Sequence, residues 1–379
     1  MGPLDGLKII EIAGIGPGQF AGMLLADMGA SVVRIERPVN EEPVFAAHAR
    51  FNVMNRSRPA VAVDLKSTQG VQLVLDLCAD ADAIFEGFRP GVMERLGLGP
   101  EACMARNEKL VYGRMTGWGQ QGPMAETIGH DANFIGLAGV YGAIGEKDRD
   151  PVYPLNLVGD MGGGGAYLVI GLLAAMLEAA QSGRGQVIDA AMVDGAASQM
   201  ASIWGFRAAG AWQDARGTNI LDGGAPFYTA YRTRDGLHMA VGPIENRFYR
   251  KLLEVLGLDD IDPARQHDQS QWPLVRQRIQ AVFATRTRDE WCELLEGTQT
   301  CCTPILSLSG AAAHPHNLAR ETFVSVDGVT QPAPAPRFSR TVSEISSAAG
   351  PVRPDLFQVL QDWGAADETL AKLQRESQA

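Results

Sequence analysis

Short apolar runs alternate with longer amphipathic stretches through the first half of the chain. Runs rich in β-branched and aliphatic residues predict strands, and the stretches between them predict helices. The first repeat consists of a strand at residues 8–13, a helix at 20–28 and a second strand at 31–36. This order predicts a parallel sheet with helices on its faces.

The alternation continues to about residue 208. We expect further strands at 60–65, 83–87, 110–115 and 185–189, and helices at 70–79, 166–180 and 192–208. The pattern therefore predicts a large domain of the α/β class.

From Gly217 onward the pattern changes. Two apolar runs, 228–233 and 237–242, flank an Asp235-Gly236 pair, which favours a hairpin turn. Short helices are expected at 246–255, 273–283 and 288–296, and a polar helix from Pro354. We therefore predict a large domain over residues 1–216, completed by 311–379, and a small α+β domain over 217–310.

Composition narrows the function classes. With 379 residues, 46% of them apolar and 20% charged, the chain can form two globular domains. A net charge of −11 argues against nucleic acid as a partner. No signal peptide and no apolar run of membrane-spanning length is apparent, so we expect no membrane. Five cysteines without a CxxC pair indicate a reduced, cytoplasmic setting and no metal site.

Two carboxylates and a histidine frame the stretch from Gly129 to Gly165. His130 and Asp131 open one apolar segment, and Asp160 precedes four glycines that lead into an apolar helix. An acid/base pair beside a backbone anion site suits proton transfer next to a carbonyl. The structural alternatives are a capping or core role for His130 and a helix cap for Asp160. We expect Asp131 to orient or cap rather than to react.

Other residues also have two interpretations. Basic side chains near the strand ends suggest a phosphate-rich ligand, or else solvated charges: Arg34, Arg37, Arg56, Arg58, Lys66, Arg89 and Arg95. The turn from Gly14 to Gly18 imitates a dinucleotide fingerprint, but Pro17 removes a needed N–H and the spacing departs from the motif. Glu245 follows a strand, where a surface acid or a helix cap is the simple explanation.

Several motifs together resemble a known family. They include GPLDGLKIIEIAGIGPG, VVRIERP, VDLKS, GFRPGVMERLGLGP, MTGWGQQGP, GHDANF, NLVGDMGGG, GQVIDAAMVDG, LDGGAPFY and PAPRFSRT. The sequence resembles the family III CoA-transferase superfamily over nearly its whole length. Within that superfamily it is similar to the racemases that act on 2-methylacyl-CoA thioesters.

The resemblance implies a fold and a reaction. The fold would be a Rossmann-like large domain with a smaller α+β domain, in a homodimer of interlinked chains. The reaction would interconvert (2R)- and (2S)-2-methylacyl-CoA by 1,1-proton transfer through an enolate, with no cofactor beyond the CoA moiety of the substrate. His130 and Asp160 would be the two bases, and Glu245 would support His130.

The resemblance also implies CoA contacts. These would come from Arg37, Val63, Asp64, Leu65, Lys66, Gly87, Phe88, Arg89, Arg95, Gly129, Asp131, Ala132, Asn133 and Phe134. Two alternatives remain: a CoA-transferase in which Asp160 is the nucleophile, and an acyl-CoA-binding protein without activity. The presence of both His130 and Asp160 favours the racemase.

Overall fold

The chain divides into two compact units in a computed structural model that describes residues 2–38 and 49–350, with residues 360, 361, 363, 365, 367, 370, 371 and 375. The large unit comprises Met1–Ala138, Leu155–Gln199 and Ala319–Ala379, and the small unit comprises Gly139–Pro154 and Met200–Leu318. His48 and the first part of the helix predicted from Pro354 lie outside the described residues.

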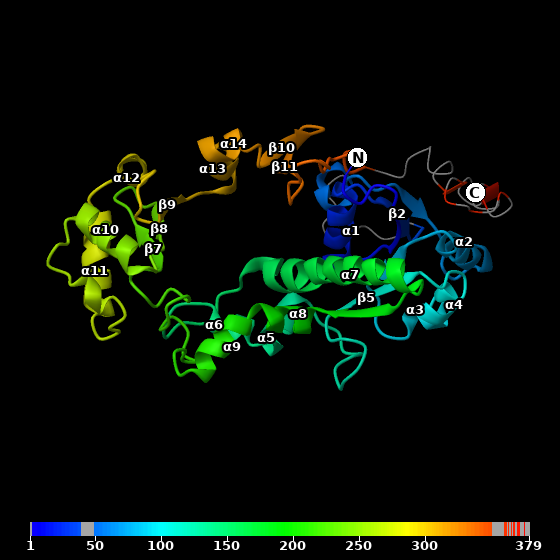
Figure 1. The fold of residues 1–379 in the computed structure, drawn as a ribbon, viewed down its shortest axis with the longest axis horizontal. Helices are drawn as coiled ribbons and strands as arrows, with labels where there is room; N and C mark the ends of the chain where they lie inside the picture. Colours follow the sequence, from blue (N-terminus) through cyan, green and yellow to red (C-terminus); the bar gives the residue numbers. More distant parts are fainter. Residues whose placement is uncertain are drawn as a thin grey trace. The chain divides into compact units, whose positions relative to one another are not determined.

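A six-stranded parallel sheet forms the centre of the large unit (Figure 1). Its strands are β1 (Lys8–Ile12), β2 (Ser31–Glu36), β3 (Ala60–Ala62), β4 (Ala83–Glu86), β5 (Val111–Thr116) and β6 (Val187–Ala191). Their order, β3-β2-β1-β4-β5-β6, reverses direction between β1 and β4. In open α/β sheets ligands bind beside such a switch point, at the carboxyl ends of the strands. The predicted α/β class is confirmed.

Helices cover both faces of this sheet. They are α1 (Pro17–Asp27), α2 (Thr68–Cys78), α3 (Val92–Arg95), α4 (Pro100–Met104), α5 (Asp131–Leu137), α7 (Tyr167–Ser182) and α8 (Met192–Gln199). Successive strand residues enter opposite core clusters, since side chains alternate along a strand. Ile9 packs in the cluster that contains Leu25 of α1 and Leu168 of α7, whereas Ile10 packs in the cluster of Leu73 of α2.

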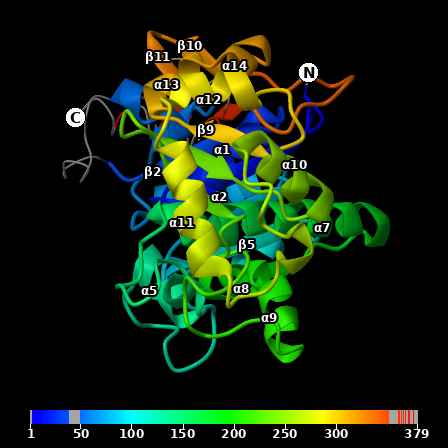
Figure 2. The same ribbon diagram turned by 90° about the vertical axis from the view of Figure 1, so that its left-hand side faces the viewer.

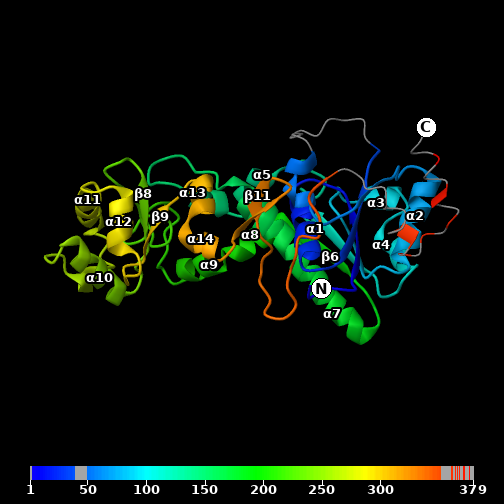
Figure 3. The same ribbon diagram turned by 90° about the horizontal axis from the view of Figure 1, so that it is seen from above.

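The small unit contains an antiparallel sheet in the order β7-β8-β9. Figure 2 and Figure 3 show this sheet among α10, α11 and α12. The bounds are β7 (Thr229–Arg232), β8 (His238–Val241), β9 (Cys302–Ile305), α6 (Val140–Ala143), α9 (Ala201–Ala208), α10 (Asn246–Leu256), α11 (Trp272–Phe283), α12 (Arg288–Leu295), α13 (Leu308–Ala313) and α14 (Pro315–Ala319). Tyr231 stacks on Phe283 at 5.3 Å in its core. The predicted hairpin is confirmed, with Gly236 at φ +80°.

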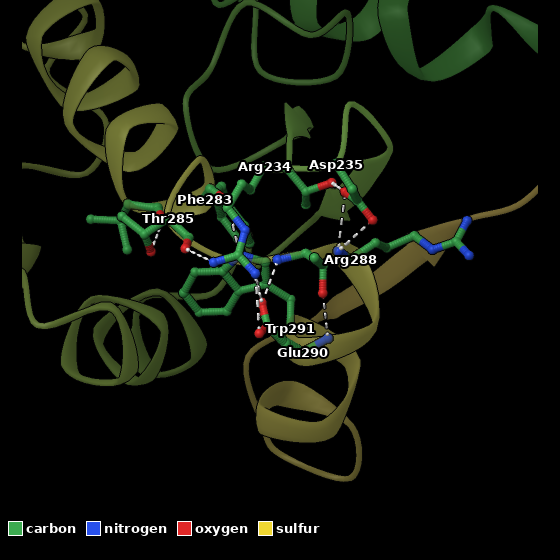
Figure 4. A network of polar contacts seen from close by, with 10 residues as sticks. Arg234, Asp235, Phe283, Thr285, Arg288, Glu290 and Trp291 are labelled. Atoms are coloured by element: carbon green, nitrogen blue, oxygen red, sulfur yellow. Dashed lines mark hydrogen bonds and ion pairs between the residues drawn. The ribbon is translucent and has the colours of Figure 1, made fainter.

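A polar network fixes the hairpin turn against the start of α12 (Figure 4). The Arg234 guanidinium donates to both carboxylate oxygens of Glu290, at 3.0 and 3.2 Å, and Asp235 accepts from the backbone N–H of Arg288. Glu290 also accepts from the N–H of Thr287 at 2.7 Å, and the Thr287 hydroxyl accepts from the N–H of Glu290. This reciprocal capping box satisfies two donors at the helix start.

The boundaries of the two units differ from the predicted domain boundaries. Residues 139–154, 200–216 and 311–318 cluster with the small unit. The physical reason for the first two segments is loop packing: a Cβ on Gly145 would lie 3.0 Å from Arg216, and a Cβ on Gly217 would meet the backbone of Lys147. Contacts between loops 70 residues apart leave no mark on local hydrophobic periodicity.

Two elements differ from the predicted pattern. The helix expected at 192–208 is divided at Met200 into α8 and α9. A hairpin of β10 (Phe323–Val326) and β11 (Val329–Pro332) was not predicted. Its turn, Asp327-Gly328, has positive φ at both residues, and an Asp-Gly pair is the sequence signal that could have revealed it.

One helical stretch, Leu155–Ser182, is long and apolar enough to cross a membrane by length and composition alone. We expected no stretch of this length, because the apolar run itself stops at Glu178. Helical structure begins earlier than the apolar run, at Leu155, which lengthens the segment. In the large unit this segment contacts β5, β6 and α1.

Candidate active site

His130 lies at the cap position of α5, after the loop that follows β5. Its backbone N–H donates to Asn133 Oδ1 at 3.0 Å, and the N–H of Asn133 donates to the His130 carbonyl at 2.8 Å. The two bonds fix the backbone at the start of the helix. The side chain of His130 is exposed, so its imidazole is accessible.

Asp160 lies within a π-helix, η4 (Val158–Ala166), which runs directly into α7 and follows a 3₁₀ turn, η3 (Leu155–Leu157). We expected Asp160 to precede a helix whose free N–H groups follow it. That expectation is wrong, because Asp160 is the third residue of the π-helix. π-Helices are rare and occur frequently at functional sites.

The glycines after Asp160 allow close packing of helices. A Cβ on Gly163 would lie 2.7 Å from the backbone nitrogen of Ala196 in α8, and one on Gly164 would lie 2.9 Å from Pro17 of α1. Only residues without a side chain permit this approach. The backbone anion site predicted beside these glycines is therefore corrected at Gly163 and Gly164, where α8 and α1 occupy the space.

Asp131 connects α5 to the π-helix. Its side chain is 3% exposed, and its Oδ1 accepts from the backbone N–H of Asp160 at 2.6 Å. A charged acceptor makes this a strong hydrogen bond. Asp131 therefore orients the backbone of Asp160, and the N–H of Asp160 is already engaged.

The Asp160 carboxylate lies in a partly enclosed, charged setting. Burial raises the pKa of this carboxyl above its ordinary value; a hydrogen bond from Asn156 opposes the shift, the charge of Asp131 adds to it, and His130 opposes it. His130 and Asp131 are thus close enough to act on the charge of Asp160. A raised pKa keeps more of a carboxyl protonated near neutral pH, as a general acid requires.

Asn156 is a site residue that sequence reasoning did not single out. Its Nδ2 donates to Asp160 Oδ2 at 3.0 Å. The signal available in the sequence was the spacing of four residues, which brings side chains together on a helix surface. Nothing in that spacing distinguished Asn156 from other polar residues nearby.

The glycine turn after β1 borders the same carboxylate. Gly16 has φ +72°, and a Cβ built on it would lie 3.0 Å from Asp160 Oδ2. The turn therefore makes room for the Asp160 side chain. This placement accounts for Gly16 without a pyrophosphate.

Glu245 belongs to the small unit, directly before α10. Its carbonyl accepts from the N–H groups of Phe248 and Tyr249, both at 3.0 Å, and its side chain is exposed. Glu245 is close enough to Cys301 for its charge to help raise the pKa of that thiol, after the larger effect of burial. The expectation that Glu245 supports His130 stays a prediction.

Candidate CoA-binding residues lie at the carboxyl ends of three strands of the parallel sheet, of which β2 and β3 are neighbours and β4 is separated from β2 by β1. Arg37 follows β2, residues 63–66 follow β3, and residues 87–89 follow β4. The guanidinium of Arg37 lies over the ring of Phe88 at 5.5 Å. Since Arg37, Lys66, Arg89 and Arg95 are all exposed, this edge presents several accessible cations. Among the described residues no group of His, Cys, Asp and Glu is arranged to hold a metal ion.

Three of the basic residues predicted for this edge are buried instead. Arg56 donates to both oxygens of Asp27, at 2.6 and 3.1 Å. Arg58 pairs with Glu11, and Arg34 pairs with Glu36. Buried ion pairs of this kind join elements of the fold and leave no charge for a ligand, so Arg34, Arg56 and Arg58 are removed from the binding site. The partners of Arg56 and Arg58 could not be assigned from local sequence, because Asp27 and Glu11 are distant in the chain. Glu36 lies only two residues from Arg34.

Phe134 also contributes less than expected. Its ring is 4% exposed and contacts Trp118 edge-on, with the ring centroids 4.7 Å apart. Gly117 and Gly129 leave the space that this ring fills. Only the backbone of Phe134 is therefore available to a ligand. Gly129, Ala132 and Asn133 remain accessible at the start of α5.

Comparison with known proteins decides the family. A family model described as CoA-transferase family III matches residues 4–356. The chain belongs to CoA-transferase family III. Within this family it is 43% identical over 373 residues to the alpha-methylacyl-CoA racemase of Mus musculus, covering 98% of this chain and 96% of that protein.

Another relative and a solved structure are also similar to this chain over nearly its whole length. The alpha-methylacyl-CoA racemase of Homo sapiens is 38% identical over 374 residues, covering 98% of this chain and 96% of that protein. The crystal structure of a CAIB/BAIF family protein from Brucella suis has a TM-score of 0.80 at 27% identity, covering 96% of this chain and 99% of that chain.

Proposed function

We propose that this protein is an isomerase that interconverts the (2R) and (2S) epimers of 2-methylacyl-CoA thioesters. The observation that carries the proposal is the pairing of two proton-transfer groups in the large unit. Asp160 has a raised pKa and is anchored by Asp131, and the charge of His130 reaches it. The names of the mouse and human relatives support the same reaction.

The reaction follows from the acidity of a proton beside a thioester carbonyl. His130 accepts this proton from one face of the α-carbon, and the electron pair of the C–H bond moves to the thioester oxygen. Protonated Asp160 then donates a proton to the opposite face, and the carbonyl re-forms with inverted configuration. In the reverse direction the two groups exchange roles.

A CoA-transferase is the rival reaction. There Asp160 would attack the thioester, and a free carboxylic acid would be needed to receive CoA. An exposed histidine close to Asp160 is unnecessary for that chemistry but is required for two-base proton transfer. We therefore favour the racemase, with no cofactor beyond the CoA moiety of the substrate.

The proposed reaction predicts simultaneous exchange and inversion. One pure epimer of a 2-methylacyl-CoA, incubated with the protein in deuterated water without any carboxylic acid, should gain an α-deuteron and approach an equal mixture of epimers. Mass spectrometry measures the deuterium, and chiral chromatography measures the ratio. Formation of a new thioester only after addition of a carboxylic acid, without inversion, would instead assign the transferase reaction.

We also propose that the working unit is a homodimer with interlinked chains. Ile170 and Leu177, seven residues apart on α7, are 60% and 65% exposed, and Trp204 of α9 is 57% exposed. Residues spaced by seven lie on one side of a helix, so α7 presents an apolar stripe. A second copy of the chain would cover it, and would bring Glu245 of one chain to His130 of the other.

Mixing two inactive variants tests this arrangement. Under the shared-site model, a dimer of His130→Ala with Glu245→Ala has one site with both defects and one intact site. Random mixing should therefore restore about a quarter of wild-type activity. The assay is racemisation after co-refolding, with mixed dimers confirmed by two affinity tags.

A matched control mixes two variants whose defects both lie in the large unit. His130→Ala mixed with Asp160→Asn leaves every site with one defect, and no activity should return. Absence of recovery in the first mixture, despite confirmed mixed dimers, would place Glu245 beside His130 of its own chain or away from the site.

The cellular setting is a further proposal. All five cysteines, each within the described residues, are free thiols, and Cys301 is exposed. Free thiols persist where glutathione and thioredoxin keep them reduced, which supports the cytoplasm. Acyl-CoA esters are the small-molecule partners that we expect there.

A further inference from the structure

Glu86 is the last residue of β4 and directly precedes the turn at residues 87–89. Its Oε2 accepts from the backbone N–H of Phe88 at 2.6 Å. We infer that Glu86 is a positioning residue, which holds this turn in the conformation that binds the CoA moiety of the substrate. The inference rests on the proposed function, since it assumes that CoA binds at this edge of the sheet.

The conformation of this turn also determines the position of the Arg37 guanidinium. The ring of Phe88 supports the guanidinium of Arg37 at 5.5 Å, a cation–π contact between residues that follow two different strands. Arg37 is otherwise exposed and would sample many rotamers. A hydrogen bond at Phe88 N therefore fixes both the backbone of the turn and the direction of the Arg37 side chain.

The surroundings of Glu86 leave its charge incompletely compensated. Arg114 and Tyr112 face it from β5 and Glu94 faces it from α3. Arg114 is committed elsewhere, since it donates to Gln120 Oε1 at 2.7 Å and pairs with Glu94. Because Glu86 is only 4% exposed, water does not solvate its charge.

Burial accordingly raises the pKa of Glu86 to about 7, while the bond from Phe88 and the charge of Arg114 oppose the shift and Glu94 adds to it. The ionised carboxylate is the stronger acceptor for the Phe88 N–H. The turn is therefore held most firmly above neutral pH, and protonation loosens it.

As pH rises, the turn is held more firmly, but the contribution of Glu86 to folding stability falls. A carboxyl with a higher pKa in the folded than in the unfolded chain binds more protons when folded. Glu86 therefore contributes a loss of stability as pH rises from its ordinary value of 4.5 to about 7. The charged form of Glu86 thus lowers stability while it holds a binding turn. Such a trade of stability for function is typical of functional positions.

Calorimetric titration of a 2-methylacyl-CoA ester tests the inference. Between pH 6 and pH 8, wild-type affinity should rise about fivefold relative to Glu86→Gln, the order expected when a charged acceptor replaces a neutral one. The phosphates of CoA titrate equally in both proteins, so the ratio of the two affinities isolates Glu86. The turnover rate at saturating substrate should differ by less than about twofold, because the turn binds the ground state.

Two further variants complete the design. Glu108→Gln, an exposed acid at the amino end of β5, should match wild type at every pH. Arg37→Ala, which removes an exposed side chain, should bind more weakly and lose most of the pH response even if Glu86→Gln does not fold. A constant affinity ratio between wild type and Glu86→Gln, or a full pH response in Arg37→Ala, would overturn the inference.

The outcome is separable from that of the proposed reaction. If the ester binds with the expected pH response but is not racemised, the reaction is wrong and the role of Glu86 stands. If wild type does not bind the ester at any pH, the CoA site and the role of Glu86 are both wrong.

Discussion

Asp160→Asn and His130→Ala should each lower the racemisation rate by about three orders of magnitude or more, because each removes one of two proton-transfer groups. Affinity for the CoA ester should remain within about threefold of wild type, since the cations predicted to contact CoA lie elsewhere on the sheet edge. An amide at residue 160 keeps the bond from Asn156 but neither accepts nor donates the substrate proton.

The two variants should differ in the epimer whose proton they exchange. With His130 absent, Asp160 can still remove the proton that faces it, so one epimer should exchange in deuterated water. Asp160→Asn should exchange the other epimer. His238→Ala, in an exposed position of β8, should racemise at the wild-type rate. Near wild-type racemisation by either variant, or exchange of the same epimer by both, would refute the two-base assignment.

Gly195→Ala should destabilise the protein by about 3 kcal/mol or more, the upper range for overpacking of a closed interface. Gly195 lies in α8, where a Cβ would overlap the carbonyl oxygen of Gly163 in the π-helix. Both clashing groups belong to backbones, so neither can move away as a flexible side chain would. The midpoint of thermal unfolding should fall by roughly 6 °C or more.

Gly195→Ala should also reduce racemisation in proportion to the loss of folded protein, because the same contact supports the π-helix that carries Asp160. Gly136→Ala is the matched control in the large unit: it lies in α5, and a Cβ there would meet nothing within 4 Å. Alanine at an unobstructed helical position should raise stability by up to about 1 kcal/mol. An unchanged unfolding temperature for Gly195→Ala would mean that α8 and the π-helix do not pack as described.

Local sequence patterns determined the strands of the parallel sheet and the fold class of the large unit. The apolar runs ending at Ile12, Glu36 and Glu86 are strands of one parallel sheet, because β-branched runs separated by helices leave few other arrangements. The Asp235-Gly236 turn was predictable for a similar reason, since few residues tolerate positive φ. The resemblance carried by the GHDANF and NLVGDMGGG motifs indicated His130 and Asp160 directly.

What only the tertiary structure decided depends on partners distant in the chain. The sequence alone did not distinguish the buried Arg56 from the exposed Arg37, because the ion pair of Arg56 with Asp27 is formed only in the fold. The glycines after Asp160 are likewise explained only by the packing of α8 and α1. The π-helix is a further example, because the periodicity of its glycine-rich sequence did not predict it. Periodicity reports which side of an element is buried. It does not report which side chain or backbone group lies opposite, and that determines the setting of Asp160.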